Sequence, residues 1–146
     1  MSISKELWQQ IEEELKGIFG SASFKLDGHE ISIERRSKTE GMTVLCVFID
    51  GKIEYKFIQP DKHPSEIHSK VWRTRKVSVY SPKEKQRIYK EFGKRKAKEY
   101  FPNLEKKGAY LDSTFNTALS LVRQFKKLEG LEVVKVGVKT AEELIA

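Results

Sequence analysis

Apolar residues recur at helical spacing over the first twenty positions of the chain. Ser4 is a helix N-cap residue, Gly20 is placed to end the helix, and the acidic run Glu12–Glu14 falls on the opposite side. The apolar positions of this repeat are Ile3, Leu7, Trp8, Ile11, Leu15, Ile18 and Phe19. The pattern predicts a helix over residues 4–19 that packs on a sheet, with Trp8 in the core.

Two Asp-Gly pairs separate runs in which apolar and polar residues alternate. Asp27-Gly28 and Asp50-Gly51 predict two-residue type I′ hairpins, because glycine accepts the positive φ that this turn needs. The first turn would pair Phe24 with Ile31 and Leu26 with His29; the second would pair Phe48 with Ile53, Cys46 with Tyr55 and Val44 with Phe57. These pairs share one buried face.

The hairpins together predict a four-stranded antiparallel meander over residues 22–58. Its third strand, Val44–Ile49, is apolar on both faces, which favours a central position with cover on each side. Beyond Pro60 and Pro64 the pattern is irregular, and residues 71–80 fit either a short strand or an ordered arm.

Helix signals dominate the second half of the chain. Ser81-Pro82-Lys83-Glu84 combines an N-cap, a first-turn proline and a capping-box glutamate, and predicts a helix to about Tyr100, before Pro102. Asp112 or Ser113 would cap another helix, with Gly130 after its end; its apolar face would hold Phe115, Ala118, Leu119, Val122 and Phe125. Residues 131–138 alternate like a strand, and a short helix follows Thr140. We therefore expect one α+β domain over residues 1–146, with an N-terminal helix on the meander and a helical second half that contains a short strand.

Positive charge is concentrated in one segment of this 146-residue chain. The whole chain carries 28 Lys and Arg against 21 Asp and Glu, a net charge of +7. Residues 61–108 alone hold fifteen cations against six acids, a net charge of +9. Positive charge that is concentrated in one segment favours a polyanionic partner. The alternative is that these residues only keep the surface soluble.

The predicted helix over residues 82–100 gathers part of this charge on one side. At 100° per residue, five cations fall within a ridge of about 80° that contains no acid. They are Lys83, Arg87, Lys90, Lys94 and Lys98. Tyr89, Ile88 and Phe92 fall on the other side, which should pack inward.

A short basic arm precedes this helix. Arg73, Arg75 and Lys76 can contact phosphates, and an arginine can also stack on bases. Trp72 could provide a stacking surface or anchor the arm in the core, and we favour the anchor. The eight cations of the arm and the ridge are the predicted binding site.

Candidate catalytic and metal-binding residues are few. Glu54 and Lys56 weakly match a metal-dependent nuclease, but Asp50, the nearest second carboxylate, is explained by its turn. Histidine and cysteine, the soft zinc ligands, are limited to His29, His63, His68 and Cys46, too few at this spacing for a zinc site. Cys46 should point into the core without a nearby base. We expect no enzyme activity, no metal and no cofactor.

The second half resembles a group of small basic proteins encoded by bacteriophages and prophages. The residues that carry the resemblance are Trp72-Arg73, Phe92-Gly93-Lys94-Arg95 with Ala97, Tyr100-Phe101-Pro102-Asn103-Leu104, Ser120-Leu121 and Glu132-Val133-Val134. It covers roughly half of the chain. The resemblance implies a mobile-element setting, in which small proteins handle DNA, redirect the host or inhibit host defences, and it supplies no catalytic residues.

The leading hypothesis is a non-enzymatic phage or mobile-element protein that binds DNA, RNA or a nucleoprotein complex. The alternatives are an anti-CRISPR or other anti-defence inhibitor that binds a host protein, and a metal-dependent nuclease. The single cysteine favours a reducing cytoplasm, and no apolar run reaches the roughly 20 residues of a membrane span.

Overall fold

The protein consists of two compact units. A computed structural model describes residues 3–145. We name residues 1–73 with 111–146 the sheet unit, and residues 74–110 the basic unit. Each unit is described by itself.

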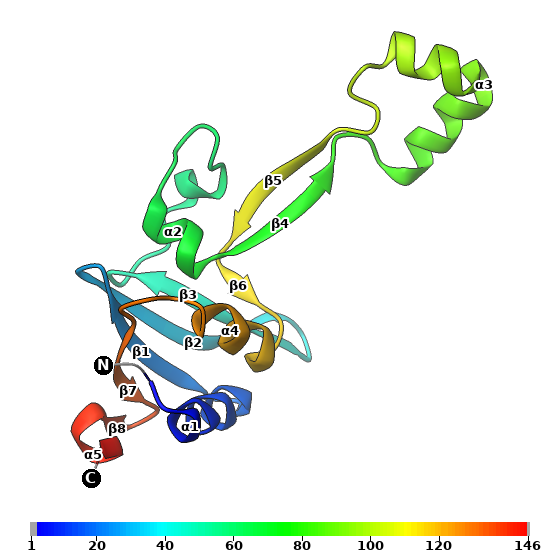
Figure 1. Ribbon diagram of the computed structural model, residues 1–146. Helices are drawn as coiled ribbons and strands as arrows, with labels where there is room; N and C mark the ends of the chain where they lie inside the picture. Colours follow the sequence, from blue (N-terminus) through cyan, green and yellow to red (C-terminus); the bar gives the residue numbers. More distant parts are fainter. Residues whose placement is uncertain (1–2, 146) are drawn as a thin grey trace. The chain divides into compact units, whose positions relative to one another are not determined.

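The sheet unit is built on a six-stranded sheet with the strand order β6-β3-β2-β1-β7-β8 (Figure 1). Neighbouring strands are antiparallel throughout. The strands are β1 (Ser21–Leu26), β2 (His29–Thr39), β3 (Met42–Ile49), β6 (Thr114–Phe115), β7 (Glu132–Val136) and β8 (Lys139–Thr140). The mixture of helices and sheet confirms the α+β class, but the sheet has six strands instead of the expected four.

Two helices, α1 (Lys5–Lys16) and α4 (Ala118–Phe125), cover one face of this sheet (Figure 1). The ring of Phe24 on β1 contacts both of them, since it stacks on Trp8 of α1 and meets Phe125 of α4 edge to face. All three side chains are buried, so the prediction that Trp8 belongs to the core is confirmed. The unit also contains the 3-10 helix η1 (Tyr55–Ile58) and the helices α2 (Glu66–Val71) and α5 (Ala141–Ile145).

The first predicted hairpin forms in the expected register. Phe24 lies opposite Ile31 and Leu26 lies opposite His29, and both Asp27 and Gly28 have positive φ. In the second hairpin the Asp50-Gly51 turn is correct, but it closes only one bridge, between Ile49 and Lys52.

The expected fourth strand is therefore wrong. The predicted pairs of Phe48 with Ile53, Cys46 with Tyr55 and Val44 with Phe57 do not form, because the chain turns away into η1. The free edge of β3 instead pairs with β6, where Leu45 lies opposite Phe115. The central position of β3 is confirmed, with a partner from much later in the chain.

The buried face of β3 is shifted by one residue from the prediction. Ile31 and Ile33 of β2 lie opposite Ile49 and Val47, so the odd-numbered positions of β3 face the main core. Cys46 therefore lies on the opposite face and is half-buried, contrary to the expectation that it points into the core. A one-residue change of register reverses the faces of a strand, and a strand that is apolar on both faces does not signal which face is buried.

Helix boundaries differ from the predictions at two places. Ser4 caps α1 as expected, but the helix ends at Lys16, before Gly17, and leaves Ile18 and Phe19 exposed. The later helix starts after Thr117 and not after Asp112 or Ser113. The Asp112 carboxylate instead accepts hydrogen bonds from the backbone and the hydroxyl of Thr114, which stabilises the turn into β6.

The basic unit carries α3 (Pro82–Tyr100) between the two strands of a ribbon, β4 (Arg73–Ser78) and β5 (Lys107–Asp112) (Figure 1). Of the two structures considered for residues 71–80, the strand is correct. The Ser81 hydroxyl accepts a hydrogen bond from the backbone N–H of Glu84, and the helix ends before Pro102, both as predicted. Among the described residues, no helix combines the length and the apolar character required to cross a membrane.

Candidate nucleic-acid interface

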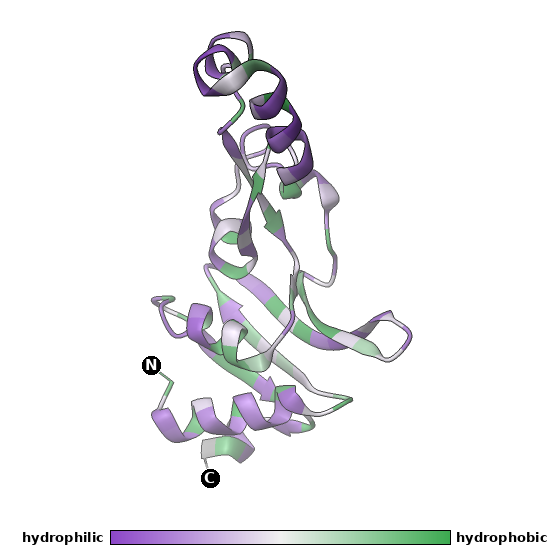
Figure 2. Cartoon of the chain, turned by 90° about the vertical axis from the view of Figure 1, so that its right-hand side faces the viewer, coloured by the Kyte–Doolittle hydropathy of each residue, from purple (hydrophilic) through white to green (hydrophobic). Residues whose placement is uncertain are grey.

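All of the net positive charge belongs to the basic unit. Residues 74–110 hold twelve Lys and Arg against four Glu, a net charge of +8. The remaining residues hold sixteen cations against seventeen acids, a net charge of −1. Figure 2 shows α3 in the hydrophilic colour along most of its length. A compact unit with this charge is a candidate surface for a polyanion.

The single ridge predicted along α3 is interrupted at Gly93. This glycine has a φ of 77° and a ψ of 161°, so α3 is two helical segments joined at a kink. Lys83, Arg87 and Lys90 still share one side of the first segment, because they are spaced by four and three residues. Lys94 and Lys98 lie on the second segment, and the helical wheel of the first does not extend to them.

Packing between the two segments makes a small core. Ile88 of the first segment, Ala97 of the second and Leu104 are buried together. The ring of Phe92 contacts Phe101 at a centroid distance of 5.7 Å, and Phe101 meets Tyr80 at 6.2 Å. The basic side chains of both segments are thus carried on one folded body.

Most of the cations of α3 are exposed and have no acidic partner. Lys85 pairs with Glu105, with 3.3 Å between Nζ and Oε2. Among the described residues, no carboxylate lies within ion-pair distance of the other cations of α3. These exposed cations are Lys83, Arg87, Lys90, Lys94, Arg95, Lys96 and Lys98.

Arg95 and Lys96 were missed by the sequence prediction. On a helical wheel drawn through the whole of α3, both residues fall outside the ridge. The kink at Gly93 breaks this repeat, and a second helical segment starts at Lys94. Ala97 is then the buried position of the second segment, and Lys94, Arg95, Lys96 and Lys98 surround it. Gly93 inside a helical pattern was the available signal, since glycine is unfavourable within a helix.

The arm residues lie on β4. Arg73 and Arg75 are half-buried and Lys76 is exposed. Because side chains alternate along a strand, Lys76 points to the face opposite that of Arg73 and Arg75. Trp72 is fully buried, and its Nε1 donates a hydrogen bond to the Val47 carbonyl 3.1 Å away. Its predicted role as an anchor is confirmed.

Glu105 links the aromatic and basic sides of the unit. It accepts hydrogen bonds from the Tyr89 hydroxyl and from Lys85 Nζ, and these bonds hold the pKa of its carboxyl below the ordinary value. The same bond from Tyr89 raises the pKa of that phenol. Glu105 therefore stays ionised, pairs with Lys85 and also interacts electrostatically with Lys98.

The residues considered for metal-dependent chemistry do not assemble into a metal site. Lys52 and Lys56 flank the Glu54 carboxylate at 3.8 and 3.7 Å. Within the described part of the chain, no three His, Cys, Asp or Glu side chains lie close enough together to hold a metal ion. Burial raises the pKa of the Cys46 thiol, which keeps it protonated near neutral pH.

Comparison of the chain with protein-family models, with curated proteins and with solved structures found no match.

Proposed function

We propose that the protein binds nucleic acid, or a nucleoprotein complex, through phosphate contacts made by the basic unit. The observation that carries this proposal is the set of seven exposed cations on α3 for which no ion pair is found among the described residues. Like charges one helical turn apart cost on the order of 0.2–0.5 kcal/mol per pair. A row of phosphates would remove this repulsion and release counterions on binding.

The binding residues would be Lys83, Arg87 and Lys90 on the first segment of α3 and Lys94 and Lys98 on the second. Arg75 and Lys76 on β4 belong to the same unit and would extend the surface, and Arg95 and Lys96 now join it. Arg73, which was predicted with them, is the last residue of the sheet unit before the basic unit begins. Flexible lysines and a small aromatic core favour phosphate contacts over base recognition, so we expect little sequence preference. We place this activity in a reducing cytoplasm, which the single cysteine favours, and give the protein a phage or mobile-element origin, as the resemblance implies.

A salt series tests the mode of binding. Fluorescence anisotropy with duplex DNA, duplex RNA and single-stranded RNA would be recorded between 50 and 200 mM salt. Phosphate contacts give a slope of about −0.9 per contact on duplex DNA, so six contacts would lower the affinity about 10³-fold over this range. Failure to bind any of the three probes at 50 mM salt would reject the proposal and favour the protein-binding inhibitor.

Charge reversal tests the location of the surface. Arg87→Glu with Lys94→Glu changes one exposed cation on each segment of α3 and should nearly abolish binding without unfolding the protein. Lys126→Glu with Lys127→Glu is the matched control, because these residues are equally exposed but belong to the sheet unit. An equal loss in the control would show that bulk charge, and not α3, is responsible.

A further inference from the structure

A hollow of about 260 Å³ lies on the basic unit, against the first segment of α3. We name it the aromatic pocket, because three of its seven lining residues are Tyr80, Phe92 and Phe101. Tyr80 precedes α3, Phe92 is the last residue before the kink at Gly93, and Phe101 follows the second segment. The kink therefore allows the three rings to meet. The other lining residues are Glu84, Arg87, Ile88 and Glu91.

The three rings keep surface that a ligand can contact. Each of them is partly exposed, whereas Phe24 and Phe125 in the main core are fully buried. Phe101 meets Tyr80 at an interplanar angle of 85° and Phe92 at 55°, so neither ring lies flat on that of Phe101. Aromatic rings that line a pocket favour a flat, apolar or aromatic occupant.

The carboxylates of the aromatic pocket are available to a ligand. Glu84 and Glu91 are exposed, and no ion pair is found for either of them among the described residues. Ionised carboxylates repel a phosphate, but they accept hydrogen bonds from N–H groups, which every unpaired nucleobase carries. These two residues therefore admit a base to the hollow and keep a phosphate out of it.

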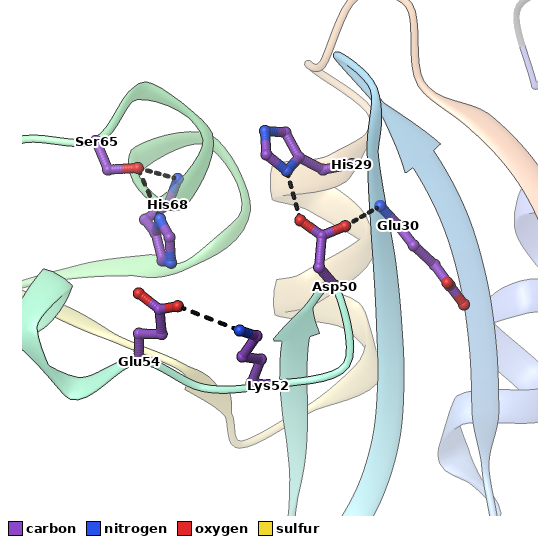
Figure 3. Close-up of polar contacts among 7 residues, drawn as sticks. All are labelled: His29, Glu30, Asp50, Lys52, Glu54, Ser65 and His68. Carbon is purple, nitrogen blue, oxygen red and sulfur yellow. Dashed lines mark hydrogen bonds and ion pairs between the residues drawn. The ribbon is translucent and has the colours of Figure 1, made fainter.

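A larger hollow of about 420 Å³ next to the Asp50-Gly51 turn differs in this respect. Its acidic groups are already paired within the sheet unit. The Nδ1 atom of His29 lies 2.7 Å from Asp50 Oδ2, and Lys52 Nζ lies 3.8 Å from Glu54 Oε1 (Figure 3). The aromatic pocket is thus the hollow with carboxylates left for a ligand.

Arg87 connects the aromatic pocket to the cations of α3. It lines the pocket and also belongs to the row of Lys83, Arg87 and Lys90 on the first segment. A phosphate at the rim of the pocket would meet this row. A positively charged ligand would also suit aromatic rings and carboxylates, but Arg87 and the net charge of +8 on residues 74–110 repel it. A neutral flat group joined to a phosphate satisfies both conditions.

We infer that the aromatic pocket takes one unpaired base of a single-stranded nucleic acid, while Arg87 and the neighbouring lysines contact the phosphates beside it. In a duplex the bases are paired and stacked on each other, so a base would first have to leave the stack. Stacking on protein rings tolerates any sequence because every base has a flat face, which agrees with the expected lack of sequence preference. This inference rests on the proposed function and names its substrate class.

Strands with and without bases test the inference. The full-length protein is titrated with a fluorescein-labelled single-stranded DNA of about 12 nucleotides, and with a strand of the same length that carries tetrahydrofuran in place of every nucleoside. Both strands have the same phosphates. The abasic strand should bind about 5- to 150-fold more weakly, the range for one stacked base, and this ratio should change little between 50 and 200 mM salt.

Phe92→Leu removes one ring from the aromatic pocket and should lower the ratio of the two affinities by about fivefold or more. Tyr100→Leu is the matched control, because Tyr100 is 62% exposed and contacts Phe92 but does not line the pocket, so the ratio should be unchanged. Tyr80→Leu is the second pocket variant and serves if circular dichroism shows that Phe92→Leu does not fold.

Equal affinity of the wild type for the two strands would overturn the inference, and the proposed function would stand on phosphate contacts alone. A ratio that falls in Tyr100→Leu but not in Phe92→Leu or Tyr80→Leu would also overturn it, since the base would then stack outside the pocket. If neither strand binds at 50 mM salt, the proposed function fails together with the inference.

Discussion

At the scale of single residues, Trp72 both packs in the main core and makes a buried hydrogen bond. The side chain is fully buried, and Nε1 donates to the Val47 carbonyl of β3. Gln124 of α4 donates to the carbonyls of Lys70 and Trp72 at 2.9 and 2.7 Å, which fixes the backbone on either side. The end of α2 is therefore tied to both the sheet and a core helix.

Trp72→Phe should destabilise the sheet unit by about 2–3 kcal/mol, because it removes the hydrogen bond and leaves a cavity beside the smaller ring. Urea unfolding followed by circular dichroism measures the loss. Trp8→Phe is the control. Trp8 is almost as buried, but within the described residues its indole N–H has no hydrogen bond, so this variant should lose less stability than Trp72→Phe. An equal loss in the two variants would contradict a role for the hydrogen bond.

The pair of His29 and Asp50 makes stability depend on pH. The pKa of Asp50 is lowered in the folded protein, so its contribution is present above the ordinary Asp value and is lost as the pH falls through the lowered value. Asp50→Asn should therefore be less stable than wild type at pH 7, by at most about 1 kcal/mol since the pair is half-exposed, and the difference should shrink in acid.

Thermal unfolding between pH 2 and pH 7 checks this prediction. Asp61→Asn is the control, because Asp61 is exposed and no ion pair or hydrogen bond to it is found among the described residues. If the difference in stability between Asp50→Asn and wild type grows in acid, the predicted direction of the pH dependence is wrong.

At the scale of elements, the kink in α3 decides how the basic side chains are grouped. Gly93 adopts a backbone conformation that L-residues rarely enter, with nothing within 4 Å of the position that a Cβ would take. A larger side chain would thus meet backbone strain and no steric clash. The kink, which replaces one straight helix and one continuous ridge, therefore depends on glycine at this position.

Gly93→Ala should destabilise the basic unit by about 1–3 kcal/mol, the usual cost of such a conformation for a residue with a Cβ. Faster amide hydrogen exchange over residues 82–100 is the expected result. Gly108→Ala is the control, because its Cβ would also meet nothing within 4 Å and its φ is not positive. Unchanged exchange in Gly93→Ala would show that the kink is not needed.

At the scale of the whole molecule, the two units have very different cores. Among the described residues, the main hydrophobic cluster contains 21 buried residues, whereas the cluster of the basic unit contains only Ile88, Ala97 and Leu104. Burial of apolar surface is the dominant stabilising contribution to folding. The basic unit should therefore open more readily than the sheet unit.

Native-state hydrogen exchange read out by mass spectrometry tests this difference. Amides of β1, β2 and β3 should exchange slowest and those of α3 several orders of magnitude faster, because α3 opens without unfolding the sheet. Saturating nucleic acid should protect α3 and leave the sheet unchanged. Equal protection of α3 and β2 in the free protein would show that the two units unfold together.

The sequence by itself determined the features that depend on neighbouring residues. The N-caps Ser4 and Ser81, the Asp27-Gly28 and Asp50-Gly51 turns and the stop before Pro102 follow from local hydrogen bonds and from the φ preferences of Gly and Pro. The concentration of positive charge in one segment could also be predicted from the sequence, because it requires only a count of the charged residues.

The tertiary structure decided what depends on partners far along the chain. The edge of β3 pairs with β6, more than sixty residues later, and residues 53–58 are not part of the sheet. The same departure from the sheet carries Glu54 and the α2 residue His68 to a pocket shared with His29 and Asp50, a grouping that no sequence spacing indicates. Distant segments compete to pair with the same strand edge, here the edge of β3. The sequence pattern of one strand therefore does not determine which segment pairs with it.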